Sequence, residues 1–525
     1  MKQFIAKFGD KINGVLSGFD RLVLQGKLRA LYNPGEDGME RYLKNMHVLM
    51  KDYGEFVQQV SRRVREASLA AALDLGCVVQ HVAPSADKAE VAQQLALEQR
   101  VRSGMVCVLT SVEPCWSFRT VPDRVRQQLN LKGERRQCLH IYHYWIDPEF
   151  GFMSASLQTW FPFRIQVCLN GREWLARQME RAGLAYVRQG NCFPWIADFA
   201  AAQKLMEKLV QTRWLPVLAS ISQRLNPIHG EIFRRYQANY SWTTLSSEWA
   251  VDIRFEHPED LQRLYPLLIQ HGMTTFGSAD ILRFLGQKVT LSGQVPPHCA
   301  REVESSMKQR KEGTRIKHSV DGNSVKAYDK AYMPVGNTLR LEATINRVRA
   351  FNTFRPKEGE PQGPKAWRVM RRSVEALPNR AAISGQIVER YADALASLND
   401  GTRLEELVQT LEQAAVYKGQ RVRGLRLFGE DNALLAIISR AEFNLHGFRN
   451  RDLQGHLYAT PAEAKAEARR RSAAVGRKLR LLRAHGLIEK VGPTHRYLLT
   501  ETGRITLTAI LSAQKATVAA LAQAA

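Results

Sequence analysis

The chain has no Cys-x-x-Cys pair, although seven of its 525 residues are cysteines. They are scattered at positions 77, 107, 115, 138, 168, 192 and 299. An odd number of cysteines in mostly apolar runs predicts reduced, buried thiols in a cytoplasm, and argues against a structural zinc site. The chain also lacks a run of about eighteen apolar residues, the length that a membrane helix needs. Its N-terminus lacks the apolar core of a signal peptide. We therefore expect no membrane partner.

Acidic residues are scarce relative to basic ones. The chain has 75 lysines and arginines against 51 aspartates and glutamates, a formal charge of +24, and its pI is about 9.9. A positive charge of this size attracts polyanions over long range and makes their binding strongly salt-dependent. We therefore expect nucleic acid as the partner. The alternative interpretation is that the positive charge only keeps the protein soluble.

The basic charge is concentrated near the C-terminus. Eighteen lysines and arginines stand against eight acidic residues between positions 417 and 504. Within 462–485, Val475, Leu479 and Leu482 recur at helical spacing among many arginines. This pattern predicts a basic helix with one apolar face.

A glycine and two strands are expected to follow that helix. Gly486 ends it, and strands at 487–491 and 496–500 flank a turn at 492–495. The run RKLRLLRAHGLIEKVGPTHRYLLTETGR resembles the recognition helix and wing of MarR-like and ArsR-like DNA-binding domains. The resemblance implies a winged helix whose basic helix lies on DNA. The expected nucleic-acid contacts are Arg449, Arg451, Arg469, Arg470, Arg471, Arg477, Lys478, Arg480, His495 and Arg496.

The remaining pattern predicts an α+β protein of several domains. Helices are expected at 38–49, 53–73, 200–218, 258–270 and 432–443, and strands at 105–112, 137–145, 152–169, 249–255, 315–320, 324–330 and 338–346. An Asp-Gly turn at 321–323 joins two of these strands as a hairpin. The expected domains are an N-terminal α/β domain (1–220), a central β-meander domain (221–352), a linker and helical connector (353–416), and the winged helix with a C-terminal helix (417–525). The sequence shows no internal repeat.

The meander gathers residues suited to phosphoryl transfer. Lys326, Tyr328 and Lys330 share one face of a strand, and Arg340 and Glu342 share one face of the next. A tyrosine can attack a phosphodiester, cations stabilise the developing charge, and a carboxylate can hold a divalent metal or accept a proton. The same alternation is also typical of a solvated β-face, so both interpretations stay open.

The string NSVKAYDK…LRLEATIN is similar to segments of rolling-circle replication initiators and conjugative relaxases. In those proteins a Tyr-x-Lys strand and an Arg-x-Glu strand lie in the catalytic sheet. The resemblance carries over Tyr328 with Lys330, and Arg340 with Glu342. It implies an enzyme that uses Mg²⁺ or Mn²⁺, with Glu342 as an expected ligand. Asp252 is a second candidate ligand because it is an acidic residue within an expected strand, where such residues often bind metal.

This sequence departs from those relatives at the metal strand. Their strand reads His-hydrophobe-His, whereas two residues separate the histidines of His140-Ile141-Tyr142-His143. That spacing sends the two imidazoles to opposite faces of a strand. Tyr142 and Tyr144 are candidates for stacking on unpaired bases, and Trp160, Phe161 and Phe163 are expected in the core.

Two classes of function follow from these patterns. The strings CLHIYHYW, LQTWFPFRIQVCLNGREWLARQMERAG and GFRNRDLQ resemble a bacterial protein type associated with mobile genetic elements, which implies no particular activity. The first hypothesis is an enzyme that nicks, cleaves or transfers DNA strands at a metal-assisted site. The second is a binding protein without chemistry, either a regulator or the protein part of a ribonucleoprotein that holds structured RNA. A second copy of the chain is a further candidate partner.

Overall fold

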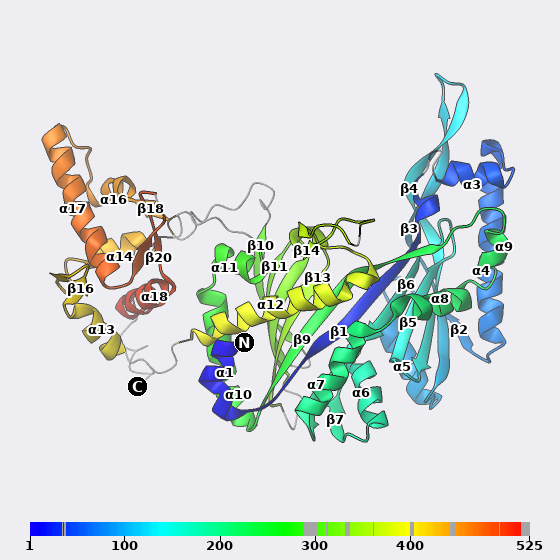
Figure 1. Ribbon diagram of the computed structural model, residues 1–525, viewed down its shortest axis with the longest axis horizontal. Helices are drawn as coiled ribbons and strands as arrows, with labels where there is room; N and C mark the ends of the chain where they lie inside the picture. Colours follow the sequence, from blue (N-terminus) through cyan, green and yellow to red (C-terminus); the bar gives the residue numbers. More distant parts are fainter. Residues whose placement is uncertain are drawn as a thin grey trace.

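Strands from both halves of the chain form one large sheet (Figure 1). The structure is a computed structural model that describes residues 1–515, apart from positions 34, 36–37, 288–301, 311–312, 331–335, 361, 399–403, 441–442, 444–446 and 493. Within these residues the eleven strands are β1 (Ile12–Leu28), β2 (Val78–His81), β3 (Gly104–Asp123), β4 (Gln128–Asp147), β5 (Gly151–Gln158), β6 (Ile165–Asn170), β9 (Tyr240–Phe255), β10 (Val303–Arg310), β11 (Gly313–Val320), β12 (Asn323–Lys330) and β13 (Thr338–Ile345). Their order is β10-β11-β12-β13-β9-β1-β6-β5-β4-β3-β2. Neighbouring strands are antiparallel, except that β2 is parallel to β3.

The two halves of the sheet share one topology. β1 is followed by α4 (Tyr53–Leu73) and then by β3 to β6, and β6 returns to pair with β1. Likewise, β9 is followed by α10 (Pro258–Thr274) and then by β10 to β13, and β13 returns to pair with β9. β1 and β9, the first strands of the two halves, pair with each other at the centre of the sheet. The fold is therefore a duplication of topology, which no internal sequence repeat discloses.

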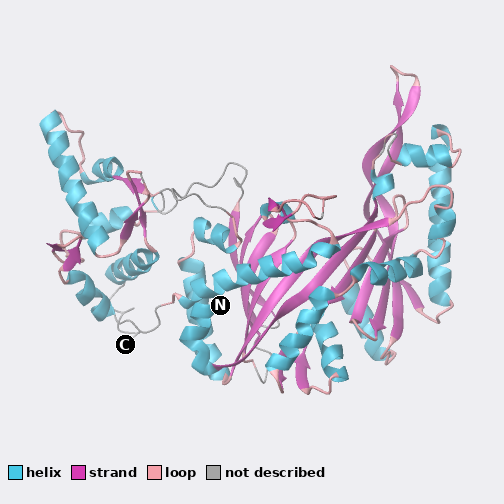
Figure 2. Cartoon of the chain, in the orientation of Figure 1, coloured by secondary structure: helices cyan, strands magenta, loops and turns pink. Residues whose placement is uncertain are grey.

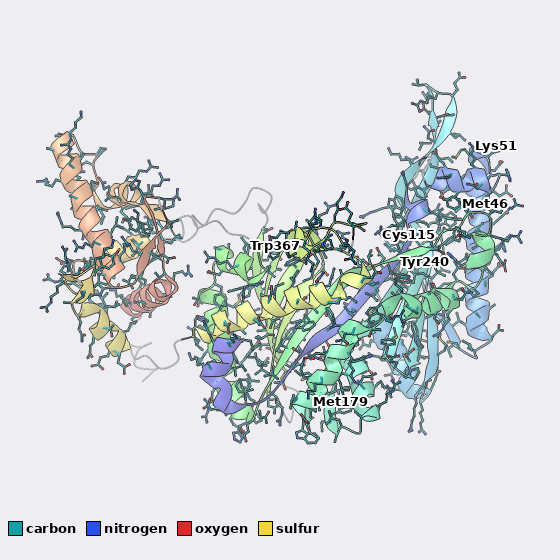
Figure 3. All side chains as sticks on the ribbon, viewed as in Figure 1. Met46, Lys51, Cys115, Met179, Tyr240 and Trp367 are labelled. Carbon is teal, nitrogen blue, oxygen red and sulfur yellow. The ribbon has the colours of Figure 1, made fainter. Side chains whose placement is uncertain are left out.

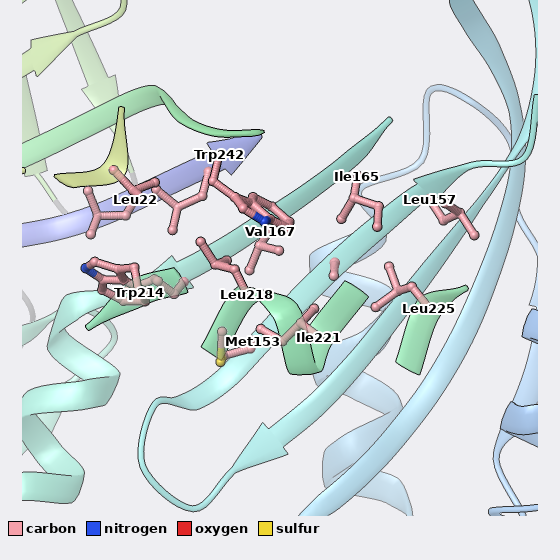
Figure 4. Packing of buried hydrophobic residues seen from close by; sticks show 14 of the residues in the cluster. Leu22, Met153, Leu157, Ile165, Val167, Trp214, Leu218, Ile221, Leu225 and Trp242 are labelled. Carbon is pink, nitrogen blue, oxygen red and sulfur yellow. The ribbon is translucent and has the colours of Figure 1, made fainter. Parts of the chain in front are cut away.

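Helices cover one face of the sheet, which we call the helical face. In the first half, Leu218 and Ile221 of α8 (Trp214–Leu225) lie in one buried cluster with Leu22 and Val167 (Figure 4). In the second half, α10 and α12 (Leu377–Ala396) supply a second buried cluster with the apolar side chains of β9, β12 and β13. Figure 2 shows α12 crossing the strands of this half. Burial of these two clusters removes a large apolar area from water and holds the sheet to its helices.

The opposite face, which we call the polar face, carries the alternate side chains. In β5 and β6 the residues of the helical face are buried, whereas Ser154, Ser156, Gln166 and Cys168 on the polar face are half-buried. Two helices cover parts of this face, α5 (Lys88–Glu98) over β3 and α7 (Phe199–Lys208) over the first half of β1. Gly14 admits α7 closely, because a Cβ at that position would lie 2.5 Å from the Phe199 ring.

The C-terminal part has its own hydrophobic cluster. Its elements are α13 (Leu404–Glu412), α14 (Asn432–Ile438), β18 (Phe448–Arg449), α16 (Asn450–Leu457), α17 (Lys465–Ala484), β19 (Ile488–Lys490), β20 (Arg496–Leu499) and α18 (Glu501–Lys515). The three strands form a sheet in the order β18-β20-β19 (orange to red in Figure 1). The remaining elements are α1 (Lys2–Phe8), α2 (Arg29–Tyr32), α3 (Met39–Asn45), α6 (Gly171–Arg181), β7 (Tyr186–Gln189), β8 (Cys192–Ile196), α9 (His229–Ile232), α11 (Ser278–Phe284), β14 (Asn352–Arg355), β15 (Ala366–Val369), β16 (Ala415–Tyr417) and β17 (Gln420–Val422).

Several expected elements differ from those observed. The ranges 1–220 and 221–352, expected as separate domains, contribute strands to the same sheet. The helix expected over 200–218 is divided between α7 and α8, and 152–169 is divided between β5 and β6. β1, a central strand, was not expected at all. No helix among the described residues is long and apolar enough to cross a lipid bilayer. The six described cysteines form no disulfide bonds with one another, and Cys299 lies outside the described residues.

Candidate functional site

Charged residues of neighbouring strands face one another in rows on the polar face. In one row Tyr328 of β12 lies opposite Arg340 of β13, which lies opposite Asp252 of β9. In the next row Lys326 lies opposite Glu342. Directly opposed residues of an antiparallel pair share a face and lie within side-chain reach. The pairing of β13 with both β12 and β9 therefore brings these side chains together.

Arg340 is the centre of a buried ion-pair network. Its side chain is 0% exposed, and its guanidinium donates to both oxygens of Asp252 at 2.5 and 2.9 Å and to Asp20 at 3.1 Å. Arg172 of α6 reaches the same Asp252 carboxylate at 2.9 Å. Burial tends to raise the pKa of Asp252, but the two guanidinium groups outweigh it and hold that pKa below its usual value. Asn191, between β7 and β8, accepts from Arg340 and donates to Asp20.

This network changes the roles given to two residues from the sequence. Arg340, expected in the catalytic group, is fully enclosed and holds neighbouring carboxylates in place. Asp252, expected as a metal ligand, has both carboxylate oxygens engaged by arginines. We therefore assign both residues to the scaffold of the site, because neither presents a free group to a ligand.

A cluster of three carboxylates lies beside the network. Oxygen atoms of Asp20, Glu248 and Glu342 lie within 4.8 Å of one another. Asp20 joins the cluster because it is the extra residue of a bulge, between the pairs Phe19–Trp249 and Arg21–Glu248; bulges re-aim side chains in this way. Asp20 is 4% exposed, and its Oδ1 is buried without a hydrogen-bond partner among the described residues.

The three carboxylates repel one another. Burial, followed by the charge of Glu342, raises the pKa of Glu248. Lys326 offsets part of the negative charge, because its Nζ contacts Glu342 and lies 3.7 Å from Glu248. Burial opposes the protonated form of Lys326, yet the two glutamates outweigh it and raise its pKa. Lys326 and, at Asp20, Arg340 therefore offset part of the negative charge of the three carboxylates.

Tyr328 lies at the more open end of the site. It is half-buried, and the Nζ of Lys330 lies 4.7 Å from its ring centroid. Burial and the charge of Glu342 raise the pKa of the Tyr328 hydroxyl, whereas Lys326 and Arg315 act in the opposite direction. The hydroxyl therefore interacts electrostatically with a carboxylate and with cations at once, and it is protonated at neutral pH.

A basic pocket lies further along the polar face, between β1 and β9. Its cavity volume is about 220 Å³, and its lining includes Gln25, Lys27, Thr243, Asn346 and the side chains of two arginines at 29 and 372. Burial and repulsion by neighbouring arginines lower the pKa of Lys27. Like charges held together in a concave site are the usual arrangement for binding an anion. Sequence analysis missed this pocket, because its cations come from segments far apart in the chain.

The histidines and aromatic residues singled out from the sequence are dispersed. His143 is on the helical face, where it contacts the Ser68 hydroxyl at 3.1 Å, and burial lowers its pKa to about 4. His140 is on the other face, so the two histidines are separated as expected. Tyr142 donates to Glu113 at 2.7 Å. Of the aromatic residues expected in the core, Phe161 and Phe163 are fully buried, whereas Trp160 is half-buried.

An aromatic pair outside the expected set is exposed. Trp367 of β15 (labelled in Figure 3) is 73% exposed, and its ring centroid lies 5.7 Å from that of Phe354 in β14. Exposed rings beside arginines are suited to stacking on unpaired bases. The sequence interpretation placed Phe354 in a linker and Trp367 in a helical connector, whereas both lie in paired strands, so the aromatic pair was missed.

The C-terminal basic residues differ in their surroundings. Lys478 lies 4.0 Å from the buried Asp431, and Arg471 pairs with Glu467. Arg449 and Arg496 are half-buried and lie opposite each other on β18 and β20. The exposed members of the expected set are Arg451, Arg469, Arg470, Arg477, Arg480 and His495. Pro493 of the turn between β19 and β20 lies outside the described residues. Comparison with protein-family models, with curated proteins and with solved structures found no match.

Proposed function

We propose that this protein binds nucleic acid on the polar face of its sheet and nicks DNA strands there, with Tyr328 as the nucleophile. The observation that carries the proposal is the meeting of Tyr328, Lys326 and three carboxylates on one partly open face. The basic pocket at Lys27 supports it, because it offers a site for a backbone phosphate on the same face. In this proposal the protein serves a mobile genetic element.

The reaction is a transfer of a phosphoryl group to tyrosine. The Tyr328 oxygen forms a bond to the phosphorus of a DNA backbone phosphate, and the bond from phosphorus to one sugar oxygen breaks. The phenolic proton passes to the carboxylate cluster, of which Glu342 is the member that interacts electrostatically with Tyr328. The sugar oxygen leaves with a proton from water. Lys326 and Lys330 stabilise the negative charge that develops on the phosphate.

The carboxylate cluster fits a divalent cation. Its donors are carboxylate oxygens, which suit Mg²⁺ and Mn²⁺, and the unpartnered Oδ1 of Asp20 is a buried acceptor in need of a positive charge. Asp20, Glu248 and Glu342 would hold the ion, which would neutralise charge on the bound phosphate. Asp252 is not among these ligands, because Arg172 and Arg340 already engage it.

The C-terminal elements are proposed to place the catalytic face on its target. The order of α14, β18, α16, α17 and the β19–β20 hairpin supports a winged helix, in which α17 enters the major groove of duplex DNA. Arg469, Arg470 and Arg477 lie on exposed positions of α17 and would face the DNA. Arg471 and Lys478 pair with acidic neighbours and would stabilise the module.

Cleavage of a labelled single-stranded or hairpin DNA in Mn²⁺ tests the proposal. We expect nicking by the full chain, together with a protein–DNA adduct that survives denaturant. Tyr328→Phe should abolish both while leaving DNA affinity unchanged, because only the attacking oxygen is lost. Glu342→Gln should reduce cleavage more than a hundredfold, since a catalytic base contributes about 10²–10⁴ in rate. Arg347→Gln is the control and should cleave normally, because the Arg347 side chain is 60% exposed where it pairs with Asp321.

Two results would contradict the proposal. Cleavage that persists in Tyr328→Phe without an adduct would make water the nucleophile. Absence of cleavage on any DNA or on RNA recovered with the protein would favour a binding protein without chemistry, in which this face contacts nucleic acid only.

A further inference from the structure

A two-stranded arm projects from the first half of the sheet. Beyond the segments in which β3 pairs with β2 and β4 pairs with β5, β3 and β4 pair only with each other among the described residues, out to Asp123 opposite Gln128. Figure 1 shows this hairpin extending away from the body of the molecule, in cyan at the upper right. Beyond Leu131, which is buried opposite Thr120, three residue pairs remain, from Val121–Asn130 to Asp123–Gln128, and they span about 10 Å at about 3.3 Å per residue.

The base of the arm is firmly held. Phe118 and Leu131 are buried in the main hydrophobic cluster, and the Tyr53 hydroxyl donates to the Phe118 carbonyl at 3.3 Å. The Trp116 ring stacks on Tyr32 at 4.9 Å between centroids. Hydrophobic anchoring of this kind fixes the direction in which the outer strands point.

The tip of the arm is an ordered turn. The Oδ1 of Asp123 accepts from the backbone N–H groups of Val125 and Arg126 at 3.0 and 3.1 Å, and its Oδ2 accepts from Asn130 at 3.2 Å. An aspartate that binds the backbone of its own turn in this way reduces the number of conformations of the turn. The arm is therefore organised before it meets any partner.

The chemistry of the arm is cationic with an apolar tip. Residues 117–136 contain six basic and two acidic side chains. At the tip, Val125 is 94% exposed and stands between the exposed Arg124 and Arg126. An exposed valine buries no apolar area and so contributes nothing to the free energy of folding. A valine flanked by two cations instead suits a partner that has an apolar surface with phosphates on either side of it.

A basic groove continues from the arm along its flank. Its cavity volume is about 560 Å³, and its lining includes Arg62 and Arg65 of α4, Arg136 of β4 and Trp160. The Arg136 guanidinium lies over the Trp160 ring, 3.9 Å from its centroid. The groove extends the positive surface from the tip toward the body of the protein.

We propose that this arm inserts into the major groove of duplex DNA, with Arg124 and Arg126 on the two phosphate backbones and Val125 at the base edges. A major groove about 12 Å wide and about 8.5 Å deep admits a two-stranded β-ribbon, and an arm of about 10 Å reaches its floor. The A-form groove of duplex RNA is too narrow and deep for such an entry. The proposal rests on nucleic acid being the ligand, but it does not depend on cleavage at Tyr328.

Fluorescence anisotropy of the full chain in EDTA, which prevents metal-dependent cleavage, tests the arm. The probes are a labelled DNA duplex, the single strand of the same sequence and the corresponding RNA duplex. Arg124→Ala/Arg126→Ala should lower affinity for the DNA duplex on the order of tenfold and reduce the salt slope by about two, because two phosphate contacts are lost. Affinity for the single strand and the RNA duplex should be unchanged. Val125→Ala should weaken duplex binding without changing the salt slope.

The matched control is Lys204→Ala/Lys208→Ala, which removes the same charge from exposed positions of α7. An equal loss in this control, or an equal loss on all three probes, would overturn the proposal, as would unchanged duplex binding. The two proposals can fail separately. If the arm variant weakens duplex binding but no form of the protein cleaves DNA, the arm proposal stands and the proposed nicking is wrong.

Discussion

Replacing Arg340 by methionine is expected to destabilise the protein strongly. The guanidinium makes three hydrogen bonds to the carboxylates of Asp252 and Asp20, and the side chain is 0% exposed. Before the change, the arginines at 172 and 340 balance the two aspartates. After it, one buried negative charge is left without a partner. Removing one partner of a buried ion pair costs about 3–5 kcal/mol, a large part of the 5–15 kcal/mol of a typical domain.

A double-mutant cycle shows whether the cost arises from unbalanced charge. Asp252→Asn in the Arg340→Met background restores neutrality among these four residues, because one cation, Arg172, and one carboxylate, Asp20, then remain. The two changes should therefore cost less together than the sum of the single changes, with a coupling of about 1–3 kcal/mol. Urea unfolding followed by tryptophan fluorescence measures each free energy. Arg347, whose side chain is 60% exposed where it pairs with Asp321, is the control, and Arg347→Met should cost less than about 1 kcal/mol. A cost below about 1 kcal/mol for Arg340→Met, or strict additivity, would refute the reasoning.

Three further outcomes are expected. Lys27→Ala/Arg372→Ala should weaken single-strand binding on the order of tenfold, yet raise the melting temperature because like charges no longer repel; lower stability would contradict this. Burial raises the pKa of Asp329 to about 6, above its usual value, so its stabilising contribution is complete below about pH 4 and is lost as the pH rises through 6. Asp329→Asn should remove that loss, about 1–2 kcal/mol in unfolding titrations, and an unchanged pH profile would exclude this carboxyl as its source. Arg470→Glu/Arg477→Glu should abolish duplex binding at moderate salt in a gel-shift assay, and unchanged affinity would exclude α17 as the recognition helix.

The sequence predicted local structure better than it predicted the assembly. The Asp321–Gly322 turn was read correctly, because both residues take the positive φ angles of 52° and 80° that a tight hairpin needs. The alternation in β12 and β13 likewise grouped Lys326 and Glu342 on one face, although it did not give the register that sets them opposite each other. By contrast, β1 was missed, because Asp20 and the glycines among its apolar residues are unusual in a strand. Asp20 is accommodated by the bulge in β1, and Gly14 and Gly18 allow α7 to approach the strand closely.

The candidate site shows the same division between local and long-range information. Tyr328, Lys326 and Glu342 lie on adjacent strands of one hairpin, so the alternation of the sequence was enough to group them. Asp20 and Glu248 complete the carboxylate cluster from positions far away in the chain, and only the pairing of β1 with β9 brings them in. Arg340 has a pattern that suits catalysis, but its burial makes it part of the scaffold.

The central claim is that Tyr328 attacks a DNA phosphate, and peptide mapping of the covalent adduct tests it most directly. The full chain is incubated with Mn²⁺ and single-stranded DNA, denatured, and digested with nuclease and trypsin before mass spectrometry. We expect the mass of a residual nucleotide on the peptide that contains Tyr328, and its absence in Glu342→Gln. A nucleotide on another residue, or cleaved DNA without any modified peptide, would contradict the account.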